Sequence, residues 1–164
     1  MKIFPTFSFF LLLIFSPLLV SAQAEHIVGG TTAEQVREEH PLFDVYTKRY
    51  QPDPSAIEYL SGVTDSVKIF AMFGTWCHDS KRHLPELMKT LEVADNPLID
   101  IEYFAVTKQK SDPEGIARNL GLKLTPTFII YYREKEIGRI VEEPALKLEE
   151  DLVQILQSGL KANR

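Results

Sequence analysis

The sequence contains a single cysteine, Cys77, among its 164 residues. One cysteine excludes a disulfide within the chain, because a structural disulfide needs two. Cys77 is therefore a free thiol, a thiol joined to another molecule, or a chemical reagent. A lone cysteine is most often a small buried hydrophobic residue, so its position along the chain has to decide between these interpretations.

The sequence also lacks an apolar run of the roughly 20 residues that a membrane-spanning helix needs. The longest run, residues 7–20, is interrupted by Pro17, follows the basic Lys2 and precedes the small-x-small triplet Ala22-Gln23-Ala24. This pattern is typical of a secretory signal peptide. We therefore expect residues 1–24 to be removed and the protein to be exported, to a periplasm or out of the cell, without a membrane anchor.

Basic residues are fewer than acidic ones, 18 against 23, which gives a net charge of −5. Loss of Lys2 with the signal leaves 17 minus 23, or −6. An acidic surface argues against nucleic acid or an anionic membrane as a partner. The remaining chain of about 140 residues fits an extension at 25–54 followed by one domain at 55–164.

Cys77 lies where a predicted strand gives way to a predicted helix. The segment Val67–Phe73 is apolar and rich in strand formers, and it ends four residues before the cysteine. After the cysteine, apolar residues recur at helical spacing: Leu84, Leu87, Met88 and Leu91. Free N–H groups and the helix dipole at a helix N-terminus favour an anion, so this position favours a reactive, exposed thiolate.

Two segments resemble the thioredoxin superfamily. Trp76-Cys77-His78-Asp79-Ser80, followed by Pro85, is similar to the family's active site, where Trp-Cys-x-x-Cys opens a helix that a proline bends. Thr125-Pro126-Thr127 and the apolar residues 128–132 resemble its cis-proline and the next strand. The resemblance covers the chain from about Ser55 to the C-terminus.

The resemblance implies a site built around Cys77 as the nucleophile. It implies that the Thr125–Pro126 bond is cis and lies beside Cys77, and that the backbone of Thr125 pairs with an extended substrate. We expect Trp76 to form an apolar wall of the substrate groove and His78 to contribute to substrate binding.

Two departures from the family pattern limit the chemistry. Ser80 stands where the family has its second cysteine, so no dithiol is present. We expect the Ser80 hydroxyl to donate a hydrogen bond to the Cys77 thiolate; the alternative is that Ser80 only caps the helix. Ala71 replaces the buried acidic residue that many thioredoxins carry six positions before the first cysteine.

The remaining pattern predicts the order of the elements. We expect helices at about 32–39, 41–50, 55–60, 78–94, 113–120 and 146–159, and strands at 67–73, 99–106, 127–132 and 136–141. This order indicates an α/β protein with a thioredoxin-like fold: a mixed central sheet flanked by helices, with an N-terminal helical extension.

Metal ligation is the competing chemistry at the site. Cys77, His78, Asp79 and His83 are all ligand types, but their spacing completes no known ligand set. We predict no metal and no cofactor.

The missing second cysteine points to monothiol chemistry. A mixed disulfide on Cys77 has to be resolved by an outside thiol. The expected partners are protein thiols or disulfides, with glutathione as a candidate; the sequence does not fix an oligomeric state. The alternative is a thioredoxin-like binding module without turnover. We favour chemistry, because an exposed thiol that does nothing is a liability in an oxidising compartment.

Overall fold

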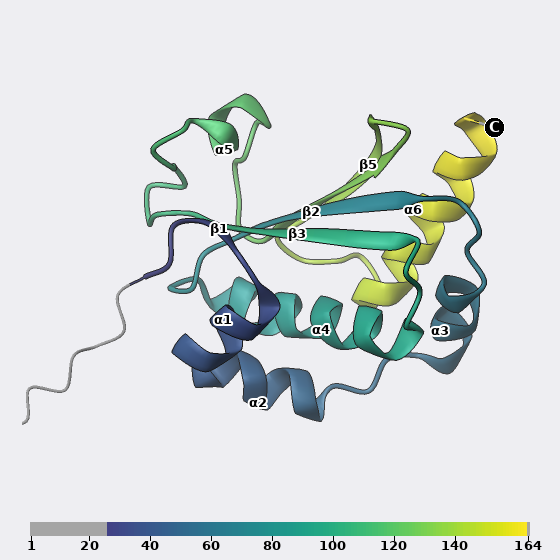
Figure 1. The fold of residues 1–164 in the computed structure, drawn as a ribbon, viewed down its shortest axis with the longest axis horizontal. Coiled ribbons are helices and arrows are strands. Elements are labelled where there is room, and N and C mark those ends of the chain that lie inside the picture. The colour runs from purple at the N-terminus through teal and green to yellow at the C-terminus, as the bar shows by residue number, and fades with distance from the viewer. Residues whose placement is uncertain (1–25, 164) are drawn as a thin grey trace, which may run out of the picture.

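A computed structural model describes residues 26–163 (Figure 1). The predicted signal peptide lies outside these residues. The elements in chain order are β1 (Gly29–Thr31), α1 (Ala33–Glu39), α2 (Pro41–Arg49), α3 (Pro54–Ser61), β2 (Val67–Phe73), α4 (His78–Ala94), β3 (Ile99–Ala105), α5 (Ile116–Asn119), β4 (Thr127–Tyr132), β5 (Lys135–Val141) and α6 (Leu148–Asn163). None of the described helices is long and apolar enough to cross a membrane.

The five strands form one mixed sheet in the order β1-β3-β2-β4-β5. β2 is the central strand, parallel to β3 and antiparallel to β4. Its nearly continuous apolar sequence suits a strand that is buried on both faces. Ile69, Ala71 and Phe73 face one core cluster and Met72 faces the other.

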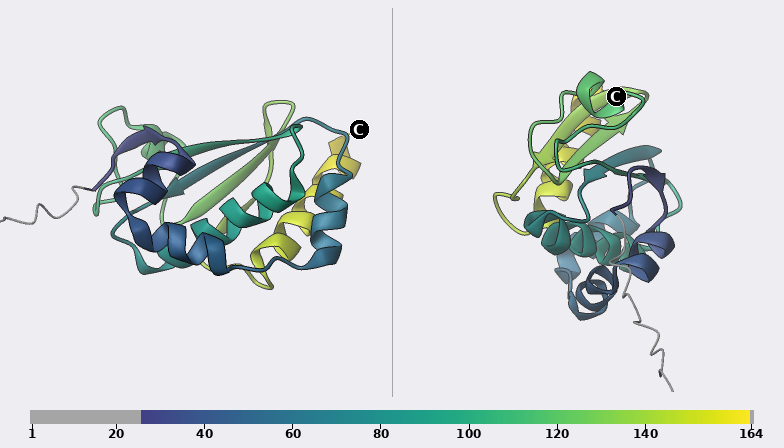
Figure 2. Two further views of the ribbon diagram at one scale, coloured as in Figure 1. Left: turned by 60° about the horizontal axis from the view of Figure 1, so that its bottom comes forward. Right: turned by 90° about the vertical axis from the view of Figure 1, so that its left-hand side faces the viewer.

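The helices cover the two faces of the sheet unequally. Helices α1 to α4 lie together on one side, α6 packs with them, and the short α5 lies on the other side (Figures 1 and 2). The larger core cluster joins the sheet to α3, α4 and α6. The smaller cluster contains Met72, Phe104 and Ile129, and Ala117 of α5 covers it. The predicted α/β thioredoxin-like architecture is therefore confirmed.

Strand β1 was not predicted. It pairs antiparallel with the end of β3, where Gly30 lies opposite Phe104. A strand of three residues that begins with two glycines has no alternation of apolar and polar side chains, so the sequence pattern gives no signal for it. The pairing adds the start of the extension to the edge of the sheet.

Two helices begin at different residues from those predicted. Helix α3 is capped by Asp53 rather than Ser55: the Asp53 carboxylate accepts hydrogen bonds from the backbone N–H groups of Ser55, at 2.9 Å, and Ala56, at 3.3 Å. Helix α5 begins at Ile116 rather than Pro113, because the Asp112 carboxylate accepts from the N–H of Ile116 at 2.9 Å and so fixes the first turn there.

The last helix is displaced toward the C-terminus. It was predicted over 146–159 and instead covers Leu148–Asn163. The Asp151 carboxylate accepts from the backbone N–H groups of Ala145, at 2.6 Å, and Leu146, at 3.1 Å, which holds these two residues in a turn before the helix. Local side-chain hydrogen bonds of this kind compete with helix formation.

A buried carboxylate attaches the N-terminal extension to α6. The side chain of Glu149 is fully buried. It accepts a hydrogen bond of 2.6 Å from the Tyr50 hydroxyl and one of 2.8 Å from the backbone N–H of Asp53. Burial, and secondly the hydrogen bond to Glu149, raise the pKa of Tyr50 above its usual value of 10.0.

Replacing Tyr50 with phenylalanine is expected to destabilise the fold by about 1–3 kcal/mol, because the buried Glu149 carboxylate loses a donor. Urea unfolding measures this loss, with the exposed Tyr46→Phe as control. Since the folded pKa of Tyr50 is raised, its contribution to stability is complete below pH 10 and declines above it, where the unfolded phenol ionises. Wild type should therefore lose its advantage over Tyr50→Phe above pH 10; a constant difference would contradict this.

Candidate active site

Cys77 is the residue that precedes the first turn of α4. Its backbone is extended, with φ −78° and ψ 134°, and its carbonyl accepts the first hydrogen bond of the helix from the N–H of Lys81 at 3.1 Å. The Cys77 N–H donates to the carbonyl of Gly74 at 2.9 Å, which closes the turn between β2 and the helix. The cysteine is therefore at the helix N-terminus that the sequence predicted.

The thiol lies against the loop that precedes β4. Cys77 Sγ donates a hydrogen bond of 3.1 Å to the carbonyl oxygen of Thr125, and the Thr125–Pro126 peptide bond is cis. Both the cis bond and its position beside Cys77 confirm the prediction. The expectation of an exposed thiol is wrong: only 8% of Cys77 is accessible, because the sulfur packs against the Thr125 carbonyl.

Ser80 lies one helical turn after Cys77 and is fully buried. Its hydroxyl oxygen accepts a 3.1 Å hydrogen bond from the backbone N–H of Gly74. Within residues 26–163 no hydrogen bond joins Ser80 to the Cys77 sulfur. The Ser80 hydroxyl oxygen thus holds the turn before the cysteine by accepting this hydrogen bond. Donation of the hydroxyl proton to a Cys77 thiolate stays a prediction.

The side chain of Trp76, the residue before Cys77, is held by contacts with Val106 and Gly74. The indole N–H donates to the carbonyl of Val106 at 3.0 Å, so the ring reaches across to the end of β3. The ring also covers Gly74, where a Cβ atom would lie 2.5 Å from the Trp76 ring. Position 74 therefore has to be glycine for the indole to adopt this position.

The extension contributes a contact to this turn that the sequence did not reveal. His26 Nδ1 lies 3.1 Å from the hydroxyl of the buried Thr75, two residues before Cys77.

A second histidine of the extension, His40, lies between α1 and α2. Burial lowers the pKa of His40, and the nearby His26 and Lys81 lower it further against the opposing charge of Glu39.

The residues with metal-ligand side chains do not converge. His83 is buried and its Nδ1 lies 2.7 Å from a carboxylate oxygen of Glu86, on its own helix. His78, the first residue of α4, lines a groove between α2 and α4. Across the part of the chain that the structure describes, no group of three or more histidine, cysteine or acidic side chains could hold a metal ion.

Ala71 is buried in the central strand, six residues before Cys77. It pairs with Tyr103 on one side and Phe128 on the other. No carboxylate occupies this position, so a proton that leaves a thiol at this site has no acceptor at residue 71.

Comparison with known proteins gives similarity of fold. No family model and no curated protein matches the sequence. A protein of unknown function from Pseudomonas aeruginosa is similar with a TM-score of 0.57 and 16% identity, over 82% of this chain and 89% of that chain. An HIV epitope-scaffold gives a TM-score of 0.56 and 18% identity, over 80% and 85%. Thioredoxin f2 from Chlamydomonas reinhardtii gives 0.44 and 20%, over 61% and 85%.

The sheet order, the cysteine at the start of α4 and the facing cis-proline define a protein with a thioredoxin-like fold. Within that fold, Cys77 precedes the first turn of α4, and Ser80 lies one helical turn later.

Replacing Gly74 with alanine should displace the indole of Trp76, because the added Cβ would lie 2.5 Å from the ring. Overpacking of this kind costs about 1–3 kcal/mol. Trp76 is the only tryptophan of the chain, so its fluorescence reports the change directly. We expect red-shifted emission and stronger quenching by acrylamide.

The matched control is Gly30→Ala, because a Cβ at Gly30 would meet nothing within 4 Å. Unchanged emission in Gly74→Ala, or an equal change in the control, would contradict the packing of Trp76 on Gly74.

Proposed function

We propose that this chain is an exported monothiol protein of thiol–disulfide exchange that acts through Cys77. The observation that carries the proposal is the contact of 3.1 Å between Cys77 Sγ and the carbonyl of Thr125, at a helix N-terminus and next to a cis-proline. A peptide that pairs with the backbone of Thr125 would bring its own disulfide next to this thiol. Export rests on the signal-peptide pattern of residues 1–24.

The reaction consists of two exchange steps. The Cys77 thiolate attacks one sulfur of a substrate disulfide, so a new S–S bond to Cys77 forms and the other substrate sulfur leaves as a thiolate. An external thiolate, such as that of glutathione, then attacks the mixed disulfide. It forms a disulfide with the substrate half and releases Cys77 as a thiolate. Two disulfide bonds break and two form, so no further oxidant or reductant is needed.

The Thr125 carbonyl links the state of the thiol to peptide binding. In the resting protein it accepts the S–H of Cys77. In the mixed disulfide Cys77 has no S–H, so the same carbonyl becomes available to a backbone N–H of the bound peptide. Loss of the Cys77 proton, which precedes the attack and can be balanced by protonation of the departing substrate thiolate, thus frees an acceptor at the point where the substrate becomes covalently attached.

The second candidate is a binding module without turnover. Its support is the burial of Cys77, with 8% accessible, and the donation of its proton to a carbonyl. Attack on a disulfide requires the thiol to lose this proton and become accessible. The two candidates therefore differ in whether the native protein reacts at Cys77.

Incubation of the native protein with glutathione disulfide should add one glutathione to Cys77, and an added thiol should remove it. Intact-mass spectrometry measures both steps, and Cys77→Ser should acquire no adduct. If an adduct forms only after denaturation, the thiol is inaccessible to glutathione disulfide in the native state, and the binding module is the better interpretation.

Replacing Ser80 with cysteine should allow an intramolecular disulfide with Cys77, since a Cys-x-x-Cys pair at a helix start meets the distance limits of the bond. The variant should then reduce insulin in the presence of a thiol reductant, whereas wild type remains weak. The gain should be modest, because Ala71 provides no carboxylate to accept a proton from the second thiol.

The control is Ser80→Ala, which removes the acceptor of the Gly74 N–H without adding a thiol. A new cysteine that stays reduced under mild oxidant would contradict the predicted facing of residues 77 and 80. A disulfide without reductase activity would favour the binding module.

A further inference from the structure

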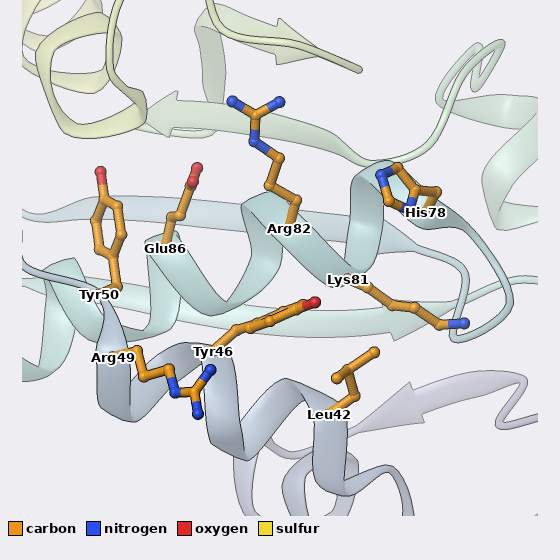
Figure 3. A pocket seen from close by; sticks show the side chains of 8 residues that line it. All are labelled: Leu42, Tyr46, Arg49, Tyr50, His78, Lys81, Arg82 and Glu86. Carbon is orange, nitrogen blue, oxygen red and sulfur yellow. The ribbon is translucent and has the colours of Figure 1, made fainter.

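A groove lies between α2 of the extension and the exposed side of α4, with a volume of about 420 Å³ (Figure 3). We call it the α2–α4 groove. The side chains that matter here come from both helices: Tyr46 and Arg49 from α2, and His78, Lys81, Arg82 and Glu86 from α4. His78, the residue that follows Cys77, lines the groove at the start of α4.

The groove is positively charged although the protein as a whole carries −5. Neither Arg49 nor Lys81 forms an ion pair with any residue between 26 and 163. Arg82 reaches Glu143 only at 3.9 Å, between two exposed side chains, and such pairs contribute little. The one acidic residue that lines the groove, Glu86, is already hydrogen-bonded to His83 at 2.7 Å.

Apolar surface lies between these charges. Leu42 is 43% exposed and Tyr46 is 41% exposed, both on the side of α2 that faces α4. In Figure 3 the Tyr46 ring extends between the two helices, beneath Arg82 and beside Lys81. A ligand in the groove can therefore bury apolar groups and place carboxylates near cations at the same time.

We propose that the α2–α4 groove binds an extended acidic segment of a substrate protein, namely the protein whose thiol or disulfide reacts with Cys77. This inference rests on the proposed exchange function and names the class of its substrate. His78 lines the groove and follows Cys77 directly in the chain, so a substrate attached to Cys77 has the groove within reach of its neighbouring residues.

The distribution of the charges favours a peptide over a small anion. Arg49 and Arg82 are exposed and come from different helices, and they point in different directions in Figure 3. A small anion needs several donors that converge on one point. Separated cations with an aromatic ring between them instead match a chain that carries carboxylates at intervals along its length.

The test uses two fluorescent peptides without cysteine that share an apolar sequence, one with acidic and one with basic residues at the intervening positions. Fluorescence anisotropy should show that wild type binds the acidic peptide, and that salt weakens this binding. The double variant Arg49→Glu, Lys81→Glu should weaken it about tenfold or more, because two attractive charges become repulsive.

The matched control is Arg118→Glu, Lys161→Glu, which changes the net charge equally at exposed positions on α5 and α6. It should bind the acidic peptide like wild type. Equal loss in the control, or equal binding of the two peptides to wild type, would overturn the proposal. So would sedimentation showing that wild type self-associates through the groove and that the groove variant does not, because the occupant would then be a second copy of the chain.

A second arm separates this inference from the proposed function. The same two peptides, each with one cysteine as a mixed disulfide with glutathione, are reacted with Cys77, and the rate constants are compared. If the acidic and basic peptides react with Cys77 at equal rates, and the groove variant leaves both rates unchanged, substrate binding in the groove is contradicted while the exchange function stands. Binding of the cysteine-free acidic peptide by a protein whose Cys77 does not react supports the groove and contradicts the exchange function.

Discussion

The central strand β2 is the constraint on which the site depends. It pairs with β3 on one side and β4 on the other, so its C-terminal end is fixed in two directions. The turn to α4 begins there, and the Ser80 hydroxyl and the Gly74 N–H join the two ends of that turn. Because β4 also follows Pro126 directly, the same sheet pairing brings the cis-proline loop to the cysteine. The site is therefore positioned by backbone pairing.

The sequence predicted the elements that carry strong apolar patterns. β2 was predicted with its observed bounds, and α4 ends at Ala94 as expected. The resemblance of the motifs, rather than any periodicity, predicted the contact between Cys77 and the Thr125–Pro126 segment. What could not be predicted depends on contacts between distant residues: the hydrogen bond between the His26 and Thr75 side chains, and the burial of the thiol.

The errors at helix ends have a common physical cause. Asp53, Asp112 and Asp151 each accept hydrogen bonds from backbone N–H groups, and each determines where a helix begins or where a turn precedes it. A sequence offers several residues that can cap a helix near every such start, and three-dimensional packing selects among them. The groove between α2 and α4 was not predicted either. The sequence indicated that α2 is a helix, but it did not show that α2 packs beside α4.

The hydrogen bonds to Glu149 affect how the chain can be divided. A boundary placed by composition between residues 54 and 55 separates Glu149 from both of its donors, the Tyr50 hydroxyl and the Asp53 N–H. A fragment that begins at residue 55 would retain every predicted site residue and yet contain a buried carboxylate without these partners. A piece of this protein that keeps these hydrogen bonds therefore has to begin before Tyr50, so the end of the extension belongs to the folding unit even though it contributes no residue to the thiol chemistry.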